Sequence, residues 1–366
     1  MRPVQGLRRT PLYGRHLALG ARTVEFAGWE MPVWYQGVVA EHLAVRRECG
    51  VFDVSHMGEL EVEGPRAREL LQRALSNDID RLRPGRAQYT LLTNERGGIV
   101  DDLIAYQISP GRYLLVVNAA NRSTAFAWLK EREAPGSDVR DVSAEYGMIA
   151  VQGPRSLERL ELPPAPSFTF VEGTIDGIAC LVSRTGYTGE VGVELLVSAD
   201  EASALWDRVL DRGATPCGLA ARDTLRIEAC YPLHGQDIGP DTDAISAGLG
   251  FACALDKEFT GVAELRRIAA QGPRRQLVPF VMDEKAVPRP GMSIVEGGTV
   301  TSGTHSPLLE RGIGLGYVPS PIARPGEKIT IDVRGRPRAA TIVDKPMYKP
   351  MYKPTPERKE GGVGSA

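Results

Sequence analysis

The sequence has few aromatic residues and few cysteines, and its charges nearly cancel. Aromatic residues make up 6% of the 366 residues, and five cysteines are scattered without any C-x-x-C pair. An odd, scattered set of cysteines argues against a disulfide scaffold or a structural zinc site, and it fits a reducing cytoplasm. With a formal net charge of −2, bulk charge gives no support to a nucleic-acid or anionic-membrane partner.

Long apolar runs and the common catalytic motifs are also missing. No stretch approaches the roughly 18 apolar residues that span a membrane, and no apolar signal-peptide core follows the first ten residues. The sequence contains no H-E-x-x-H motif, no Ser-His-Asp nucleophile elbow and no grouped metal ligands. We therefore expect a cytoplasmic protein without a metal or a membrane partner, whose length predicts two or three domains.

The most informative stretch covers residues 94–106, Asn-Glu-Arg-Gly-Gly-Ile-Val-Asp-Asp-Leu-Ile-Ala-Tyr. It predicts a β-hairpin in which Gly97 and Gly98 supply positive φ at the turn. Two aspartates inside a strand run against strand propensity. Alternation places Asp101 and Asp102 on opposite faces, so one can be solvated while the other faces a polar network or a site. The pattern alone does not choose between them.

Around this hairpin the first 141 residues predict strands and helices in irregular order. Apolar stripes at helical spacing cover residues 66–75 and 122–130. Residues 37–50 predict a third helix that exposes its charges and buries one side, which consists of Val38, Val39, His42, Leu43 and Val45. Because helices and strands do not alternate regularly, we expect an α+β unit, an antiparallel sheet with helices on one face, rather than a doubly wound sheet.

The second half partly repeats this texture and then changes character. Residues 146–152 predict a strand that ends in Gly-Pro before a helix, as residues 59–63 do, which suggests two related subdomains. From Pro279 onward, short strands broken by Gly and Pro predict a small β-barrel or jelly roll. A Pro-Met-Tyr-Lys run is duplicated in residues 346–353, and we expect the polar residues 355–366 to be disordered.

Two charged residues stand out in the middle of the chain. Glu194 lies in an apolar strand, where a carboxylate is either exposed at an edge or accepts from paired N–H donors. The glycines of residues 186–192 lack the G-x-G-x-x-G spacing of a nucleotide-binding loop, so we expect turns between strands there. Arg222 follows a small-residue helix start, and an ion pair with Asp223 or Glu228 is its simpler interpretation.

His56 is the one histidine whose neighbourhood suggests acid–base chemistry. It stands three residues after Asp53, which would suit an acid–base pair. With five histidines in the chain and no nucleophile nearby, a structural histidine with satisfied hydrogen bonds is the favoured interpretation.

Several runs, taken together and in order, resemble the T protein family of the glycine cleavage system, the tetrahydrofolate-dependent aminomethyltransferases. The resemblance covers roughly residues 8 to 350. The runs that carry it are residues 9–13 (Arg-Thr-Pro-Leu-Tyr), 26–29, 52–57 (Phe-Asp-Val-Ser-His-Met), 93–103, 152–154, 184–190 (Arg-Thr-Gly-Tyr-Thr-Gly-Glu), 218–223 (Gly-Leu-Ala-Ala-Arg-Asp), 300–303 and 306–307.

The resemblance implies transfer of a one-carbon unit and a three-domain ring. In the family, lipoylated H protein delivers an aminomethyl group, tetrahydrofolate accepts the methylene, and ammonia leaves without any metal. The implied division is a split α+β domain, an inserted ferredoxin-like α+β domain, a C-terminal β-barrel and the tail. Their bounds are residues 1–53 with 142–278, 54–141, 279–354 and 355–366.

Matched position by position, the resemblance also implies a site. Asp102 corresponds to the essential aspartate, with Val100, Ile104 and Tyr106 on its strand face, and Asp101 becomes the solvated or structural partner. A tyrosine near the C-terminus is implied as well, and ungapped matching favours Tyr352 over Tyr348. The implied folate-binding residues are Met57, Tyr89, Tyr106, Asn118, Tyr187, Glu194, Arg222 and Tyr352.

The chain departs from the family pattern in one region, and two relatives compete. Cys230 and His234 stand where the family usually has Gly and Tyr, and Ala244 and Ser246 where it has Pro and Glu. A folate-binding relative of the iron–sulfur assembly type would carry Lys-Gly-Cys-Tyr-x-Gly-Gln-Glu. The corresponding region here, residues 256–261, lacks that cysteine. A glycine-derivative demethylase would add a flavin domain with G-x-G-x-x-G, which the sequence lacks.

Overall fold

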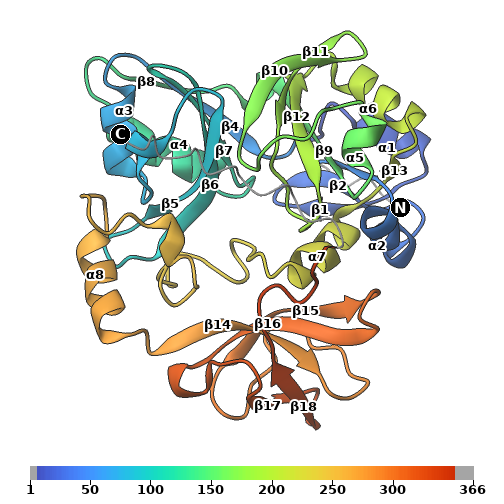
Figure 1. Ribbon diagram of the computed structural model, residues 1–366, viewed down its shortest axis with the longest axis vertical. Helices are drawn as coiled ribbons and strands as arrows, with labels where there is room; N and C mark the ends of the chain where they lie inside the picture. The colour runs from blue at the N-terminus through green and yellow to red at the C-terminus, as the bar shows by residue number, and fades with distance from the viewer. Residues whose placement is uncertain (1–5, 351–366) are drawn as a thin grey trace, which may run out of the picture.

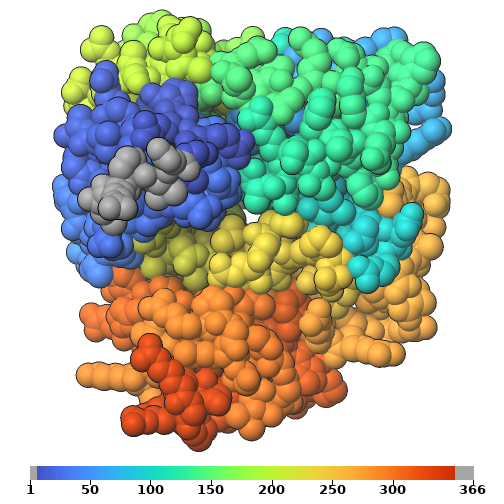
Figure 2. Space-filling model, turned by 180° about the vertical axis from the view of Figure 1, so that it is seen from behind, coloured from blue at the N-terminus to red at the C-terminus, as the bar shows by residue number. Residues whose placement is uncertain are grey.

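The computed structural model describes residues 6–350, which form three lobes (Figure 1). Two mixed α+β lobes lie side by side, and a C-terminal sheet lies below them in this view. The strand ladders are antiparallel except for the pair of β13 with β3. Seen from behind, the yellow segment around residues 230–255 lies between the upper lobes and the orange C-terminal lobe (Figure 2). The predicted α+β class is confirmed.

The first lobe is built on a five-stranded sheet with two helices. Its strand order is β5 (Arg86–Thr93), β6 (Ile99–Ser109), β7 (Arg112–Val117), β4 (Gly58–Glu63) and β8 (Asp138–Asp141). Helices α3 (Ala67–Ala74) and α4 (Arg122–Lys130) share one apolar core with these strands. The stripe of α3 is fully buried because its apolar residues recur at three- and four-residue spacing.

The strands of the second lobe come from two parts of the chain, one before and one after the segment that forms the first lobe. Its six-stranded sheet has the order β10 (Phe170–Ile175), β11 (Ile178–Ser183), β12 (Gly192–Ser198), β9 (Tyr146–Gln152), β3 (Gly50–Asp53) and β13 (Thr215–Pro216). A hairpin of two further strands and five helices accompany it: β1 (Arg22–Phe26), β2 (Trp29–Trp34), α1 (Tyr13–Ala18), α2 (Val38–Arg47), α5 (Ser156–Arg159), α6 (Ala202–Asp211) and α7 (Leu219–Glu228). The proposed domain bounds stay a prediction.

The C-terminal lobe is a five-stranded sheet reached through α8 (Val262–Gln271). Its order is β15 (Thr299–Ser306), β16 (Arg311–Pro319), β14 (Arg275–Met282), β18 (Pro337–Ile342) and β17 (Lys328–Asp332). Ser293 forms a bridge to one edge strand and Ile294 to the other. Short 3-10 turns complete the elements of residues 6–350: Ile79–Arg81, Ser143–Glu145, Gly250–Ala252 and Ser320–Ile322.

The charge pattern predicted for α2 is wrong. Glu41 and Arg46 are buried, whereas Val39 is 55% exposed. Glu41 Oε1 accepts the backbone N–H groups of residues 35–37, which directly precede the helix, and Oε2 accepts that of Gly218. Arg46 forms buried ion pairs with two glutamates that are distant in sequence. The charged side of this helix is therefore buried because groups from other segments bind its charges.

The hairpin at residues 94–106 forms as predicted, with two differences. Gly97 has φ +74°, but Gly98 is not left-handed. A Cβ at Gly98 would lie 1.9 Å from the carbonyl oxygen of Pro240, so this glycine permits close approach of another segment. Thr93 pairs with Ile99 and Leu92 with Asp101, so Val100 is an extra residue in the ladder. Val100 therefore packs in the core of the first lobe rather than beside Asp102.

Replacement of Gly98 by alanine tests this close approach. We expect Gly98→Ala to lower the free energy of unfolding by about 2 kcal/mol or more, because backbone rather than a flexible side chain must move. Gly173→Ala is the matched control, since a Cβ added there would have open space within 4 Å, and a change within about 0.5 kcal/mol is expected. Urea unfolding measures both. Equal stability of the two variants would contradict the packing argument.

Candidate active site

A cavity of about 980 Å³ lies where the three lobes meet. Strands β6 and β12, helix α7 and the segment of residues 345–350 all contribute to its wall. The structure brings most of the sequence-predicted site residues to this one cavity: Met57, Tyr89, Asp102, Tyr106, Asn118, Tyr187, Glu194 and Arg222. Tyr348 also lines the cavity, whereas Tyr352 lies outside the described residues. The choice between these two tyrosines therefore stays a prediction.

Asp101 is buried and Asp102 is half-buried, and the two carboxylates share one amide donor. Asn118 Nδ2 lies 2.8 Å from an oxygen of each carboxylate. Asp101 also accepts from Asn118 N at 3.2 Å and from Asn121 Nδ2 at 2.7 Å. Asp102 accepts from the hydroxyl of Tyr89 at 2.9 Å. Asp101 is 0% exposed, so the expectation that it could be solvated is wrong, and it is a structural partner of the pair.

This pair holds a proton more tightly than two isolated aspartates would. Burial first, and then the neighbouring charge of Asp102, raise the pKa of Asp101 to about 8. Burial also raises the pKa of Asp102, against the lowering effects of Tyr89, His234 and Asn118. Neither aspartate forms an ion pair within residues 6–350, so only neutral donors and the more distant field of other groups offset their charge. Such a pair can hold or release a proton near neutral pH.

The wall across from the pair combines a carboxylate and an arginine. Glu194 accepts from the hydroxyl of Thr185 at 2.6 Å, and its other oxygen accepts no hydrogen bond within the described chain. Arg222 Nη1 is buried and has no hydrogen-bond partner among the described residues. The guanidinium lies 4.8 Å from the ring centroid of Tyr187, and burial lowers the pKa of Arg222. These groups could bind a ligand with both donors and acceptors at one polar edge.

The simpler interpretation of Arg222 as half of an ion pair fails. Asp223 pairs with Arg226, and Glu228 pairs with Arg46 and lies near His42. Arg222 itself forms no salt bridge within residues 6–350. Its Nη1 therefore keeps an N–H that no described residue accepts.

Aromatic rings supply the flat surfaces of the cavity. Tyr89 stacks on Phe251 with 6.0 Å between centroids, and Tyr187 stacks on Tyr231 with 5.8 Å. Tyr106 is almost fully buried, and its hydroxyl lies 3.4 Å from Thr185 Oγ1. Flat walls with polar ends suit a planar heterocycle better than a flexible chain.

His56 and Asp53 are not an acid–base pair. Asp53 accepts from His16 Nε2 at 2.8 Å and from Thr10 at 2.6 Å. His56 lines the cavity, packs edge-on against Phe26, and its Nδ1 is buried without a partner among residues 6–350. The expectation that the hydrogen bonds of His56 are satisfied is therefore wrong.

Sequence reasoning missed two members of the site, Asn121 and His234. Asn121 donates to Asp101 and contacts His234 Nδ1 at 2.9 Å. A signal was available for Asn121, because Asn118 and Asn121 stand three residues apart directly after strand β7. No local signal marks His234 as a neighbour, since its partner Ile99 precedes it by 135 residues.

Within residues 6–350, no three His, Cys, Asp or Glu side chains gather in a way that would hold a metal ion. The same part of the chain contains no helix both long and apolar enough to cross a membrane.

Comparison with known proteins identifies the relatives of this chain. The family model of the GCVT N-terminal domain matches residues 12–257, and that of the glycine cleavage T-protein C-terminal barrel domain matches residues 275–349. The chain belongs to the glycine cleavage T-protein family. Aminomethyltransferases from Desulforamulus reducens and Geobacillus kaustophilus are each 47% identical, and each alignment covers 94% of this chain and 99% of the relative.

A solved structure of the same family has the same fold. The crystal structure of glycine cleavage system aminomethyltransferase T from Bartonella henselae superposes with a TM-score of 0.88 at 36% identity. The match covers 94% of this chain and 99% of that chain. The family resemblance in the sequence is thereby confirmed, and so is the fold class it implied.

Burial of His56 makes the free energy of unfolding depend on pH. Burial lowers the pKa of His56 to about 4, below the value of about 6.5 in an unfolded chain. The unfolded state therefore binds the proton first, and stability is lost as the pH falls from about 6.5 toward 4. We expect the wild type to lose about 2 kcal/mol more between pH 7 and pH 5 than His56→Gln does.

Urea unfolding at the two pH values measures this difference. His305→Gln is the control, because His305 is exposed, and its pH dependence should match that of the wild type. If the wild type and His56→Gln lost equal stability on acidification, the burial argument for His56 would be wrong.

Proposed function

We propose that this chain transfers the methylene of an aminomethyl group, carried on the lipoyl arm of glycine cleavage H protein, to tetrahydrofolate. The products would be ammonia, dihydrolipoyl H protein and 5,10-methylenetetrahydrofolate. The supporting observation is that Asp102, whose neighbour Asp101 is buried, the Arg222 guanidinium with its buried Nη1, and the carboxylate of Glu194 line one cavity of about 980 Å³. We place the reaction in the cytoplasm, which the five free, buried cysteines fit.

The residues present fit a folate. A pterin offers paired N–H donors along one edge, and Glu194 has an oxygen that accepts no bond from the described chain and could accept from them. Arg222 carries an unsatisfied N–H group that could donate to a ring or carboxylate oxygen. Tyr89, Tyr106 and Tyr187 provide flat surfaces for the ring, and Met57 and Asn118 lie in the same wall. The implied roles of these residues rest on this fit.

Asp102 is the residue to which we assign the proton work. Its carboxylate faces the cavity, and Tyr89 and Asn118 hold it in one orientation. Because burial raises its pKa, it can take a proton or stabilise positive charge that develops at a nitrogen beside it. The remaining contribution of the enzyme would be positioning of two substrates in one cavity.

The assigned roles separate into binding and chemistry, which two variants test. We expect Asp102→Asn to lower kcat by about 100-fold or more while the Kd for tetrahydrofolate changes by less than about threefold. We expect Glu194→Gln to raise that Kd by about tenfold or more, because a charged acceptor is lost from a buried site. Asp200→Asn, at an exposed position, is the control for both.

Ammonia release from aminomethylated H protein is the activity to measure, with and without tetrahydrofolate. Ammonia should appear at the catalysed rate only when tetrahydrofolate is present. Full turnover by Asp102→Asn would remove its assignment, and folate-independent release at the same rate would remove the proposed acceptor.

A further inference from the structure

His234 contacts the residues behind the aspartate pair through both ring nitrogens. Nε2 lies 3.0 Å from the carbonyl oxygen of Ile99, which can only accept, so Nε2 carries the hydrogen. Nδ1 lies 2.9 Å from Asn121 Nδ2 and therefore accepts one amide N–H. The second N–H of Asn121 reaches Asp101 at 2.7 Å. The alternative rotation of the Asn121 amide would place its oxygen against the Asp101 carboxylate, which would repel it.

We propose that neutral His234 is a positioning residue that fixes the Asn121 amide and thereby sets how tightly the Asp101–Asp102 pair holds its shared proton. The kinetic consequence of this role rests on the proposed function, whereas the electrostatic consequence does not. A charge on His234 would act on Asp102 directly. The neutral ring has hydrogen bonds to Asn121 and to the backbone of Ile99, so it acts on the aspartates through Asn121.

The number of oriented donors explains why this contact matters. Asp101 accepts three N–H groups, two from Asn118 and one from Asn121. Each such bond favours the ionised carboxylate and opposes the effect of burial. Without an acceptor at position 234, one Asn121 N–H is left unpaired and the amide is free to rotate away from Asp101. Asp101 would then keep two donors, and the pair would hold its proton to higher pH.

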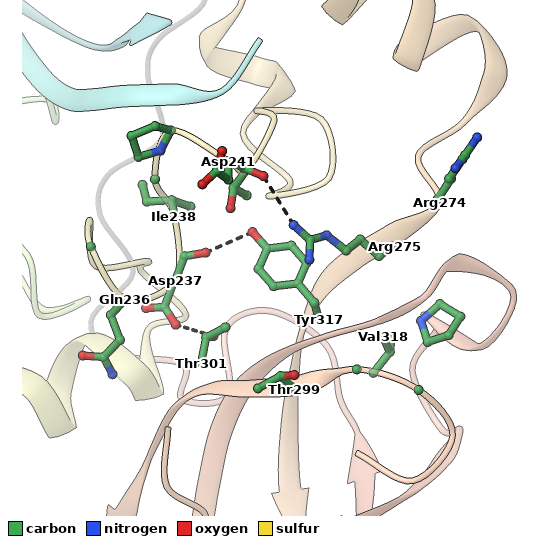
Figure 3. Close-up of a pocket in the computed structure, with 17 residues that line it drawn as sticks. Gln236, Asp237, Ile238, Asp241, Arg274, Arg275, Thr299, Thr301, Tyr317 and Val318 are labelled. Carbon is green, nitrogen blue, oxygen red and sulfur yellow. Dashed lines mark hydrogen bonds between the residues drawn. The ribbon is translucent and has the colours of Figure 1, made fainter. Parts of the chain in front are cut away.

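The fold holds His234 in place from the other side. Its loop also borders a second cavity, of about 510 Å³, against the C-terminal sheet (Figure 3). There the hydroxyl of Tyr317 donates to the backbone oxygen of Asp237, and Thr301 donates to its carboxylate. The same carboxylate accepts the backbone N–H of Leu233, next to His234. The C-terminal sheet therefore fixes the loop that carries the histidine.

The charged and titratable groups around His234 belong to several elements. On β6 these are Asp101 and Asp102, and on β5 the nearest is Tyr89, which donates to Asp102. On its own loop, Asp237 is neutralised by a buried ion pair with Arg226 of α7. His234 thus lies near the aspartate pair, whose charge no ion pair within residues 6–350 neutralises. Loss of its hydrogen bond should therefore change the apparent pKa of that pair before that of other groups.

Two substitutions at position 234 separate positioning from packing. Asparagine places an amide oxygen near the position of Nδ1 and can still accept from Asn121, whereas glutamine reaches the position of Nε2 and contacts Ile99 instead. In His234→Gln we expect the upper apparent pKa of the pair to rise by about 1 unit. The pH profile of kcat should move by the same amount, with KM for both substrates within about twofold. His234→Asn should stay close to wild type.

Infrared difference spectra of the protonated-carboxyl stretch against pH measure the pair in the full chain without substrate, with Asp101→Asn as the assignment control. Asn121→Ala removes the donor directly and must reproduce the shift, which keeps the test valid if His234→Gln does not fold. Equal titration of wild type, His234→Gln and Asn121→Ala overturns the inference, and so does an equal shift in the Asn and Gln variants. If the wild type transfers no methylene while His234→Gln and Asn121→Ala show the shift, only the proposed function is overturned.

Discussion

The cavity depends on two adjacent carboxylates in one strand, one buried and one half-buried, whose hydrogen-bond donors are all neutral. Removing a charge from water costs several kcal/mol unless hydrogen bonds replace the hydration. Asp101 and Asp102 receive those bonds from the end of β7, the start of α4 and strand β5. No single hairpin could supply them. The pair therefore requires the assembled first lobe.

The same need for distant partners organises the contact between lobes. Arg226 of α7 forms a buried ion pair with Asp237, which also accepts from Thr301 and Ser302 of the C-terminal sheet. Removal of one partner from a buried pair costs about 3–5 kcal/mol, because the other charge is left uncompensated. This cluster joins the helix that carries Arg222 to the loop that carries His234. Both walls of the cavity thus depend on one polar junction with the last lobe.

Local pattern predicted the elements whose partners are apolar and nearby. Helices α3 and α4 appear where their stripes place them, and the hairpin turns at Gly97. Pattern failed where a remote polar group decides the outcome. The buried Arg46 of α2 needs Glu190 and Glu228, more than 140 residues away, and the bulge at Val100 is a property of the paired strands rather than of one. Asp102, Glu194 and Arg222 were found because a charge in an apolar context, or a family match, marks such positions.

The departures from the family pattern fall in the segment where they have most effect. Cys230 has φ +61° and lines the cavity, at a position where the resembled family usually has glycine. A left-handed backbone costs a non-glycine residue about 1–2 kcal/mol, so the surroundings must hold it there. Four residues later, His234 stands where the resembled family usually has tyrosine, and its Nδ1 accepts an N–H of Asn121. A phenol oxygen could accept that N–H only with its own O–H turned away. The chain thus keeps the aspartate pair and changes the residue that we propose orients one of its donors, so a shared reaction in this family need not imply a shared pH dependence.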